Sequence, residues 1–287
     1  MNTLPASLLT LLSLFAFAAN SVLCRLALSS EQVDPLTFTT LRLLSAALTL
    51  TLIIAIKNKK HLISINQFGS YTGATYLFIY AAGFSYAYVT LGTATGALIL
   101  FACVQFTMLL KGWLTGVEMS KQETLGISLS LLGFGYFVYP ELNQPSLIGC
   151  ILMSLAGIAW GLYSLNGAKS SQALLDTTSN FLRLLPVVLI GMVWIYFATG
   201  FQISLLGWLY TIASGALASG IGYGVWYFVL PHLKPSIAAV SQLSVPIWAA
   251  LGGLALAAEP IDPHLALSAS VILSGILLVI LAKQNPK

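Results

Sequence analysis

The stretch TFTTLRLL (residues 37–44) returns 141 residues later as TSNFLRLL (residues 178–185), with five of eight positions identical. Each copy sets one arginine, Arg42 or Arg183, among apolar residues. Glu118 and Glu259 repeat at the same offset, so that 76 residues separate arginine from glutamate in both halves. The chain is therefore an internal duplication, and we place its two halves at residues 1–141 and 142–287.

The composition indicates an integral membrane protein. Charged residues make up 7% of the 287 residues, hydrophobic residues make up 58%, and the mean hydropathy is +0.91. A soluble domain carries about 25% charged residues. Apolar runs of about 20 residues, the length at which a helix crosses a bilayer, recur along the chain. We predict an all-α fold of ten transmembrane helices at residues 4–27, 36–56, 68–90, 94–116, 122–139, 146–168, 177–198, 206–230, 235–257 and 263–283.

The number of helices in each half determines how the halves are related. Each half holds five predicted helices, and because five is odd, the second half enters the membrane from the opposite side. Such inverted-topology repeats are typical of many secondary transporters, whose substrate site lies near the middle of the bilayer between the repeats. The duplication therefore predicts alternating access, in which two similar halves exchange conformations.

Loop charges predict the orientation. With the N-terminus inside, the cytoplasmic segments receive all the loop lysines, whereas the external loops receive Glu31, Asp34, Glu141, Glu259 and Asp262. Basic loops favour the cytoplasmic side. We expect a multi-pass protein of a bacterial inner membrane with both termini in the cytoplasm. The net charge of +4 then belongs to inside-facing loops, and no nucleic-acid partner is expected.

Two longer segments resemble a known family. The segments PSIAAVSQLSVPIWAALGGLALAAEPIDP (residues 235–263) and TGALILFACVQFTMLLKGWLTGVEMSKQETLG (residues 95–126) are similar to EamA domains of the drug/metabolite transporter superfamily. This resemblance covers nearly the whole chain. It implies ten helices, a central cavity between the halves, and export of small metabolites such as amino acids. The family often has a proline midway along the fourth helix of each half. Pro246 fits, but Gln105 takes the equivalent place in the first half, so we expect the halves to bend unequally.

The repeated arginines and glutamates are candidate gate residues. The predicted topology places Arg42 and Glu259 on the external side, and Arg183 and Glu118 on the cytoplasmic side. One interpretation is two ion pairs between the halves, Arg42–Glu259 and Arg183–Glu118, that break and form in turn. The other is structural: long arginine side chains extend to the interface or bind loop carbonyls, and glutamates lie at helix ends.

Aromatic and polar residues inside apolar helices are candidates for a substrate cavity. Ligand pockets combine aromatic walls with a few polar groups. The same residue types also form interfacial belts and hold helices together, so both interpretations stay open. The predicted cavity residues are Asn20, Tyr76, Tyr80, Gln105, Trp160, Tyr163, Tyr223, Ser241, Gln242 and Trp248.

The distribution of titratable residues bears on coupling and on the class of protein. No aspartate or glutamate falls in the middle of a predicted helix, where proton-coupled pumps usually place one, so we favour a uniporter or exchanger. The sequence contains no cluster of reactive residues of the kind that would indicate an enzyme, and we expect no cofactor and no metal. The expected partners are a small-molecule substrate and the lipid bilayer, for a monomer or weak homodimer.

One other transporter class and one non-transporter class compete with a metabolite exporter. An antiporter for anionic solutes, such as sugar phosphates or nucleotide sugars, needs basic residues in its cavity, and only Arg42, Lys111 and Arg183 could serve. A membrane scaffold would leave both the duplication and the polar residues inside the helices unexplained.

Overall fold

The computed structural model describes residues 3–29, 31–57, 60–115, 120–138, 147–233, 235–259 and 263–282, and these are almost entirely helical. Within that part of the chain the only pairing of extended backbone is the isolated bridge between Val33 and Ile203. The elements are α1 (Thr3–Ser29), α2 (Pro35–Lys57), α3 (Lys60–Ile63), η1 (Ile65–Gln67), α4 (Tyr71–Ala87), α5 (Thr93–Leu114), α6 (Lys121–Val138), α7 (Leu147–Gly167), α8 (Ala173–Arg183), α9 (Leu185–Trp194), η3 (Ile195–Thr199), α10 (Leu205–Ile212), η4 (Ala213–Ile221), α11 (Gly222–Val229), η5 (Leu230–His232), α12 (Pro235–Gln242), α13 (Val245–Ala257) and α14 (Pro263–Ala282).

The helices form a bundle whose outer surface is apolar, as expected of a multi-pass membrane protein. Each of the ten predicted segments contains at least one helix among the described residues. Large apolar side chains face outward; Leu189 is 60% exposed and Ile190 is 70% exposed on α9. Among the described residues, six helices are long and apolar enough to cross a membrane: Ala6–Ser29, Pro35–Lys57, Thr93–Leu114, Leu147–Gly167, Ala173–Ala198 and Leu205–His232.

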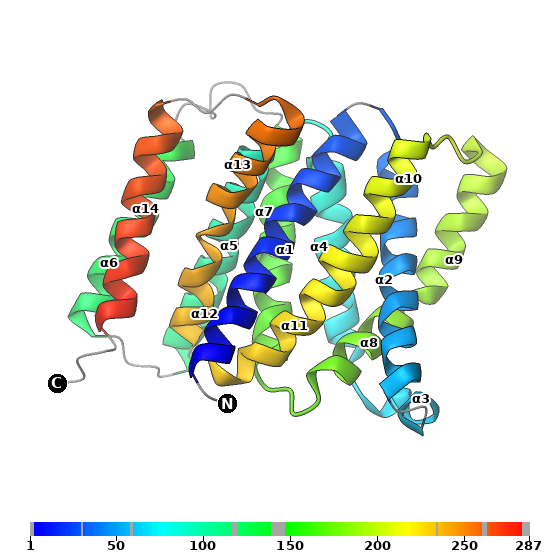
Figure 1. The fold of residues 1–287 in the computed structure, drawn as a ribbon, viewed down its shortest axis with the longest axis horizontal. Helices are drawn as coiled ribbons and strands as arrows, with labels where there is room; N and C mark the ends of the chain where they lie inside the picture. The colour runs from blue at the N-terminus through cyan, green and yellow to red at the C-terminus, as the bar shows by residue number, and fades with distance from the viewer. Residues whose placement is uncertain are drawn as a thin grey trace.

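Packing contacts show how α1, the first helix of the first half, runs relative to α5. The rings of Phe17 on α1 and Phe101 on α5 lie 6.3 Å apart, and near one edge Arg25 and Thr93 both bind Glu259, so α1 and α5 are antiparallel. Figure 1 shows α1 in front of α5 and α7.

Helix α7, the first of the second half, runs opposite to α1. Gly157 of α7 packs against the Leu100 carbonyl of α5, and Gly161 packs against the Val104 carbonyl, so α7 and α5 are parallel. Because α1 is antiparallel to α5, it is also antiparallel to α7.

The fourth and fifth helices of the two halves are antiparallel as well. Gly126 on α6 packs against the Gly275 carbonyl of α14, while Gly133 packs against Val271, nearer the start of α14. Small residues allow this close approach of backbones. In Figure 1 α6 and α14 form one flank of the bundle and α9 lies at the other. For the fourth helices, Thr93 at the start of α5 contacts Glu259 just beyond the end of α13, so these two helices run in opposite directions.

The two halves bend unequally, as Pro246 and Gln105 predict. Helix α5 is continuous, whereas its counterpart is divided into α12 and α13, with Pro246 in the first turn of α13. Proline has no backbone N–H and disrupts a helix interior. A second difference lies between α10 and α11, where η4 is π-helical, while the equivalent α4 is a regular α-helix.

Candidate substrate site and edge network

The centre of the bundle holds a hydrogen-bonded cluster to which both halves contribute. Asn20 on α1 donates through Nδ2 to the hydroxyls of Tyr80 on α4 (3.1 Å) and Tyr223 on α11 (3.2 Å), which lie 2.8 Å from each other. Ser214 on η4 donates to Asn20 Oδ1. The network therefore joins α1 and α4 of the first half to η4 and α11 of the second.

Trp160 on α7 lies at the centre of the aromatic wall beside this network. Its ring lies 4.8 Å from that of Tyr80 and 4.6 Å from that of Tyr223, measured between centroids. Its indole N–H donates to Gln242 Oε1 on α12 at 2.8 Å. We call Asn20, Tyr80, Trp160, Ser214, Tyr223 and Gln242 the central cluster.

The central cluster is closed to solvent in this conformation. Tyr80, its most exposed member, is 4% exposed, and Gln242 is fully buried. A side chain that lined a water-sized void would retain solvent-accessible surface. These side chains therefore contact one another and do not line an open cavity. Aromatic faces beside amide and hydroxyl groups suit an amphipathic solute, and such a solute must displace some of these internal hydrogen bonds.

The other predicted cavity residues lie in different surroundings. Tyr163 is fully buried, and its ring lies 5.5 Å from that of Trp160. Gln105 is also fully buried, and neither its amide nitrogen nor its oxygen has a hydrogen-bond partner among the described residues. Burying such a group unpaired costs about 1–3 kcal/mol.

Besides Tyr163 and Gln105, three more predicted cavity residues lie outside the central cluster. Tyr76 is half-buried at the margin of the hydrophobic core. The Ser241 hydroxyl donates within its own helix to the Ala238 carbonyl, at 3.2 Å. The Trp248 ring lies 4.6 Å from that of Phe15, a side chain that is 50% exposed, which places Trp248 toward the outer surface.

Two residues of this region, Ser214 and Phe17, were not predicted from the sequence. Ser214 belongs to a run of small residues, ASGALASGI, which gave no sign that its backbone is π-helical; π-helical turns are frequent at functional sites. Phe17 packs its ring 5.2 Å from Trp160 and 5.8 Å from Tyr223. Phe17 is one of many phenylalanines in apolar helices, so only the three-dimensional contacts single it out.

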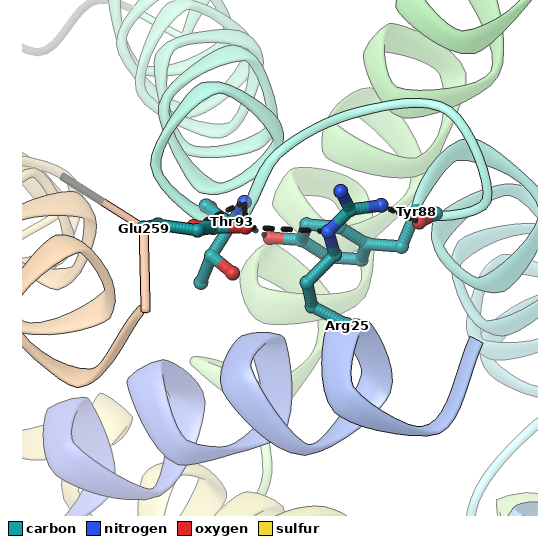
Figure 2. Close-up of polar contacts among 4 residues, drawn as sticks. All are labelled: Arg25, Tyr88, Thr93 and Glu259. Carbon is teal, nitrogen blue, oxygen red and sulfur yellow. Dashed lines mark hydrogen bonds and ion pairs between the residues drawn. The ribbon is translucent and has the colours of Figure 1, made fainter. Parts of the chain in front are cut away.

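A polar network closes one edge of the bundle (Figure 2). Arg25, near the end of α1, donates through Nε to Glu259 Oε1 at 3.2 Å and through Nη1 to the Tyr88 carbonyl at 3.2 Å. The Thr93 N–H, at the start of α5, donates to the two Glu259 carboxylate oxygens at 3.3 and 3.1 Å. A carboxylate at a helix N-terminus is favourably placed. We call Arg25, Tyr88, Thr93 and Glu259 the edge network; it joins the end of α13 to α1 and α5.

The predicted pairing of Arg42 with Glu259 requires correction. In the structure Glu259 pairs with Arg25, while Arg42 donates through Nη2 to the Ala81 carbonyl at 2.8 Å. The reason is depth in the bundle. Arg25 lies near the end of α1, within reach of the carboxylate that binds the Thr93 N–H, whereas Arg42 lies within the buried part of α2. The predicted topology places Arg25 on the external side as well, and its position near the end of the first helix was the available signal.

The second predicted pair lies partly outside the described residues, because Glu118 is not among them. Its partner Arg183 binds loop backbone instead. It donates to the Phe68 carbonyl at 2.7 Å and to the Asn66 carbonyl at 2.9 Å, and its guanidinium lies over the Tyr71 ring at 5.0 Å. Arg183 thus fits the structural interpretation, in which an arginine binds loop carbonyls.

A polar pocket lies at the edge opposite the edge network. Its volume is about 170 Å³. Tyr227 forms its inner wall. This side chain is 2% exposed, donates to the Tyr163 carbonyl at 2.9 Å, and has its ring 4.6 Å from the Tyr163 ring, in a tilted arrangement. Because Tyr163 in turn contacts Trp160, the two tyrosines separate the pocket from the central cluster. The pocket is lined by Gly69, Ser70, Asn166, Lys169, Ser170, Asp176, Asn180 and Tyr227.

A helical membrane bundle made of two similar halves, with a closed polar and aromatic centre, has the architecture of a membrane transporter. The model of the EamA-like transporter family matches this chain twice, at residues 4–139 and 147–281, and the chain belongs to that family. It is therefore a membrane transporter.

Relatives and a solved structure agree with this assignment. The chain is 43% identical over 273 residues to the uncharacterized protein PA1977 of Pseudomonas aeruginosa, covering 95% of this chain and 93% of the relative. It is 23% identical over 262 residues to the uncharacterized transporter YoaV of Bacillus subtilis, covering 86% and 87%. A crystal structure matches with a TM-score of 0.77 at 16% identity, covering 99% of this chain and 100% of the other, a likeness of fold.

Proposed function

We propose that this protein exports small metabolites, amino acids or similar amphipathic compounds, across a bacterial inner membrane by alternating access between two inverted five-helix repeats. The observation that carries this proposal is the central cluster, in which Asn20 and Tyr80 of one half bond to Ser214 and Tyr223 of the other. A solute that binds there replaces contacts between the halves, so binding is coupled to their relative movement. The antiparallel directions of α1 and α7 support the inversion.

The two edges differ in a way that supports alternating access. At one edge the Arg25–Glu259 ion pair joins the halves. At the other, the polar pocket reaches as far as Tyr227. We infer that this conformation is closed at the edge network and loaded from the pocket once the Tyr163–Tyr227 pair moves apart.

The orientation follows from the loop charges. The lysine-rich loops lie on the side of the polar pocket, which includes Lys169. By the positive-inside tendency this edge is cytoplasmic. In Figure 1 the start of α1 and the end of α14 also lie at this edge, which agrees with both termini in the cytoplasm. A pocket open to the cytoplasm is the loading state that an exporter needs.

The proposed mechanism is uniport or exchange in a monomer or weak homodimer, without a cofactor. The acidic residues of the sequence fall at the ends of helices or in loops, which leaves no acid in the centre of a helix to carry a proton. Conformational exchange is then driven by the solute gradient alone, and an imposed pH gradient is not expected to accelerate transport.

Reconstituted transport tests the proposal directly. Proteoliposomes are loaded with radiolabelled amino acids and related metabolites, and efflux is measured with and without a pH gradient. Tyr223→Phe removes a hydroxyl of the central cluster and is expected to slow efflux severalfold. Tyr196→Phe, which alters a side chain that is 68% exposed on the outer surface, is the matched control. Efflux of no compound above that of empty liposomes would refute the proposed function.

A further inference from the structure

Arg42 is a charge buried within the bundle. Its side chain is 1% exposed, and its guanidinium carbon lies 5.5 Å from the ring centroid of Phe38, 5.9 Å from that of Tyr80 and 5.1 Å from that of Phe84. Arginine keeps its proton in proteins. Aromatic faces attract the cation without neutralising it, so the site carries a full positive charge.

Among the described residues, no acidic side chain forms an ion pair with Arg42. Within the described part of the chain, the ion pair is Arg25–Glu259, and Glu259 is already held by the edge network. One arm of the Arg42 fork, Nη2, binds the Ala81 carbonyl, while Nη1 is buried and has no hydrogen-bond partner among the described residues. A buried charge without an oppositely charged partner is costly, and charged groups inside membrane helices usually mark a site of function.

Arg42 adjoins the central cluster on two sides. It lies over the ring of Tyr80, whose hydroxyl belongs to the cluster. Its backbone also packs against η4: a Cβ at Gly215 would lie 2.5 Å from the Arg42 carbonyl, and Gly215 directly follows Ser214. The guanidinium therefore lies beside the ring of Tyr80, one of the groups that we assign to the solute.

We propose that Arg42 binds a carboxylate of the transported solute through Nη1, so that the site selects compounds with one carboxylate and an apolar body. A guanidinium forms strong, charge-assisted hydrogen bonds to a carboxylate. Because a single cation with one free arm matches a single negative charge, a monocarboxylate fits better than a phosphate dianion. This inference rests on the proposed function, since it names the chemical class that the central cluster accepts.

Matched acids and amides test the proposal. The probes are 3-phenylpropionate with 3-phenylpropionamide, and L-phenylalanine with L-phenylalaninamide, in which an amide replaces the carboxylate. Binding to the full-length detergent-solubilised protein is measured as a shift of its melting temperature, and competition is measured against efflux of the solutes transported in the panel described above. The compared proteins are the wild type, Arg42→Gln, Arg42→Lys and, as a matched arginine control, Arg183→Gln.

We expect the wild type to favour each acid over its amide by about tenfold or more, as befits a charged hydrogen bond. Arg42→Gln should abolish this preference, Arg42→Lys should keep part of it, and Arg183→Gln should leave it unchanged. The preference is the ratio of the affinities for acid and amide, measured on the same protein. It therefore does not depend on how much of a variant folds. The proposal would be overturned if the wild type bound acid and amide equally or bound neither. It would also be overturned if the preference for the acid survived in Arg42→Gln. Efflux without acid preference would still leave the proposed function standing.

Discussion

Neutralising Glu259 should open the edge network. Glu259→Gln keeps the shape of the side chain and an oxygen that can accept from the Thr93 N–H, but it removes the charge that pairs with Arg25 at 3.2 Å. The two side chains are 23% and 26% exposed, so the pair is neither fully desolvated nor a free surface contact.

The expected effect can be worked from these contacts. Replacing a charged hydrogen bond by a neutral one costs about 1 kcal/mol, and losing the carboxylate at the N-terminus of α5 costs about 0.5 kcal/mol. The sum, about 1.5 kcal/mol, shifts an equilibrium about tenfold. If the closed form is dominant, the population open at this edge should rise by that factor.

Cys24 is a natural reporter of this opening. It precedes Arg25 and is fully buried when the edge network is formed. In nanodiscs, and in a background with Cys103→Ala and Cys150→Ala, the labelling rate of Cys24 by a water-soluble maleimide follows the open population when opening is rapid. Glu259→Gln and Arg25→Gln should each raise that rate about tenfold. Glu31→Gln, a matched charge change at the same edge, should not.

Two outcomes bear on the reasoning. Unchanged Cys24 labelling in both Glu259→Gln and Arg25→Gln would refute the role of the ion pair in closing this edge. The exchanged pair, Arg25→Glu with Glu259→Arg, should restore only part of the protection, because the Thr93 N–H would then face a cation instead of an acceptor. Full protection in the exchanged pair would show that charge attraction alone closes the edge.

Other substitutions test the packing and the polar contacts. Gly215→Ala should lower stability by about 1–3 kcal/mol, because its Cβ would meet α2, whereas Gly135→Ala, with nothing within 4 Å, should be neutral or slightly stabilising; melting temperatures check both. Arg183→Gln loses hydrogen bonds to two loop carbonyls and should cost about 2–4 kcal/mol, seen as a lower melting temperature and faster proteolysis near residue 66. Trp160→Phe leaves Gln242 Oε1 without its indole donor and should cost about 1–3 kcal/mol, measured by melting, and slow efflux.

The sequence predicts the helices well because hydrophobic length is a strong local signal. Each predicted segment contains a helix, and Pro246 correctly marks the unequal bend of the fourth helices. Local sequence does not predict the π-helical turn of η4. A run of small residues is compatible with either an α-helix or a π-helix. The packing of η4 against α2 and α1 is visible only in the three-dimensional structure.

The candidate site is predicted in part, for a similar reason. Polar and aromatic residues are easy to recognise in apolar helices. The sequence therefore predicts four residues that the structure brings together: Tyr80, Trp160, Tyr223 and Gln242. Trp248 belongs to the same residue class but lies beside the half-exposed Phe15. Composition identifies residues that can line a site, whereas rotation of each helix about its axis decides which of them do.

The choice of arginine partner shows why the two edges cannot be mirror images. Two matched gates require each half to supply the same ion pair, yet the residue equivalent to Arg25, at an offset of 141, is Asn166. An asparagine carries no charge to pair with Glu118, and Asn166 instead lines the polar pocket. In sequence, the Arg25–Glu259 ion pair therefore has no counterpart at the equivalent positions 166 and 118. On the pocket side, Tyr163 and Tyr227 separate the polar pocket from the central cluster. In the alternating-access cycle that we propose, an ion pair must be broken at one edge and a tyrosine pair at the other. The two openings would then have different barriers, and the proposed cycle would not be symmetric.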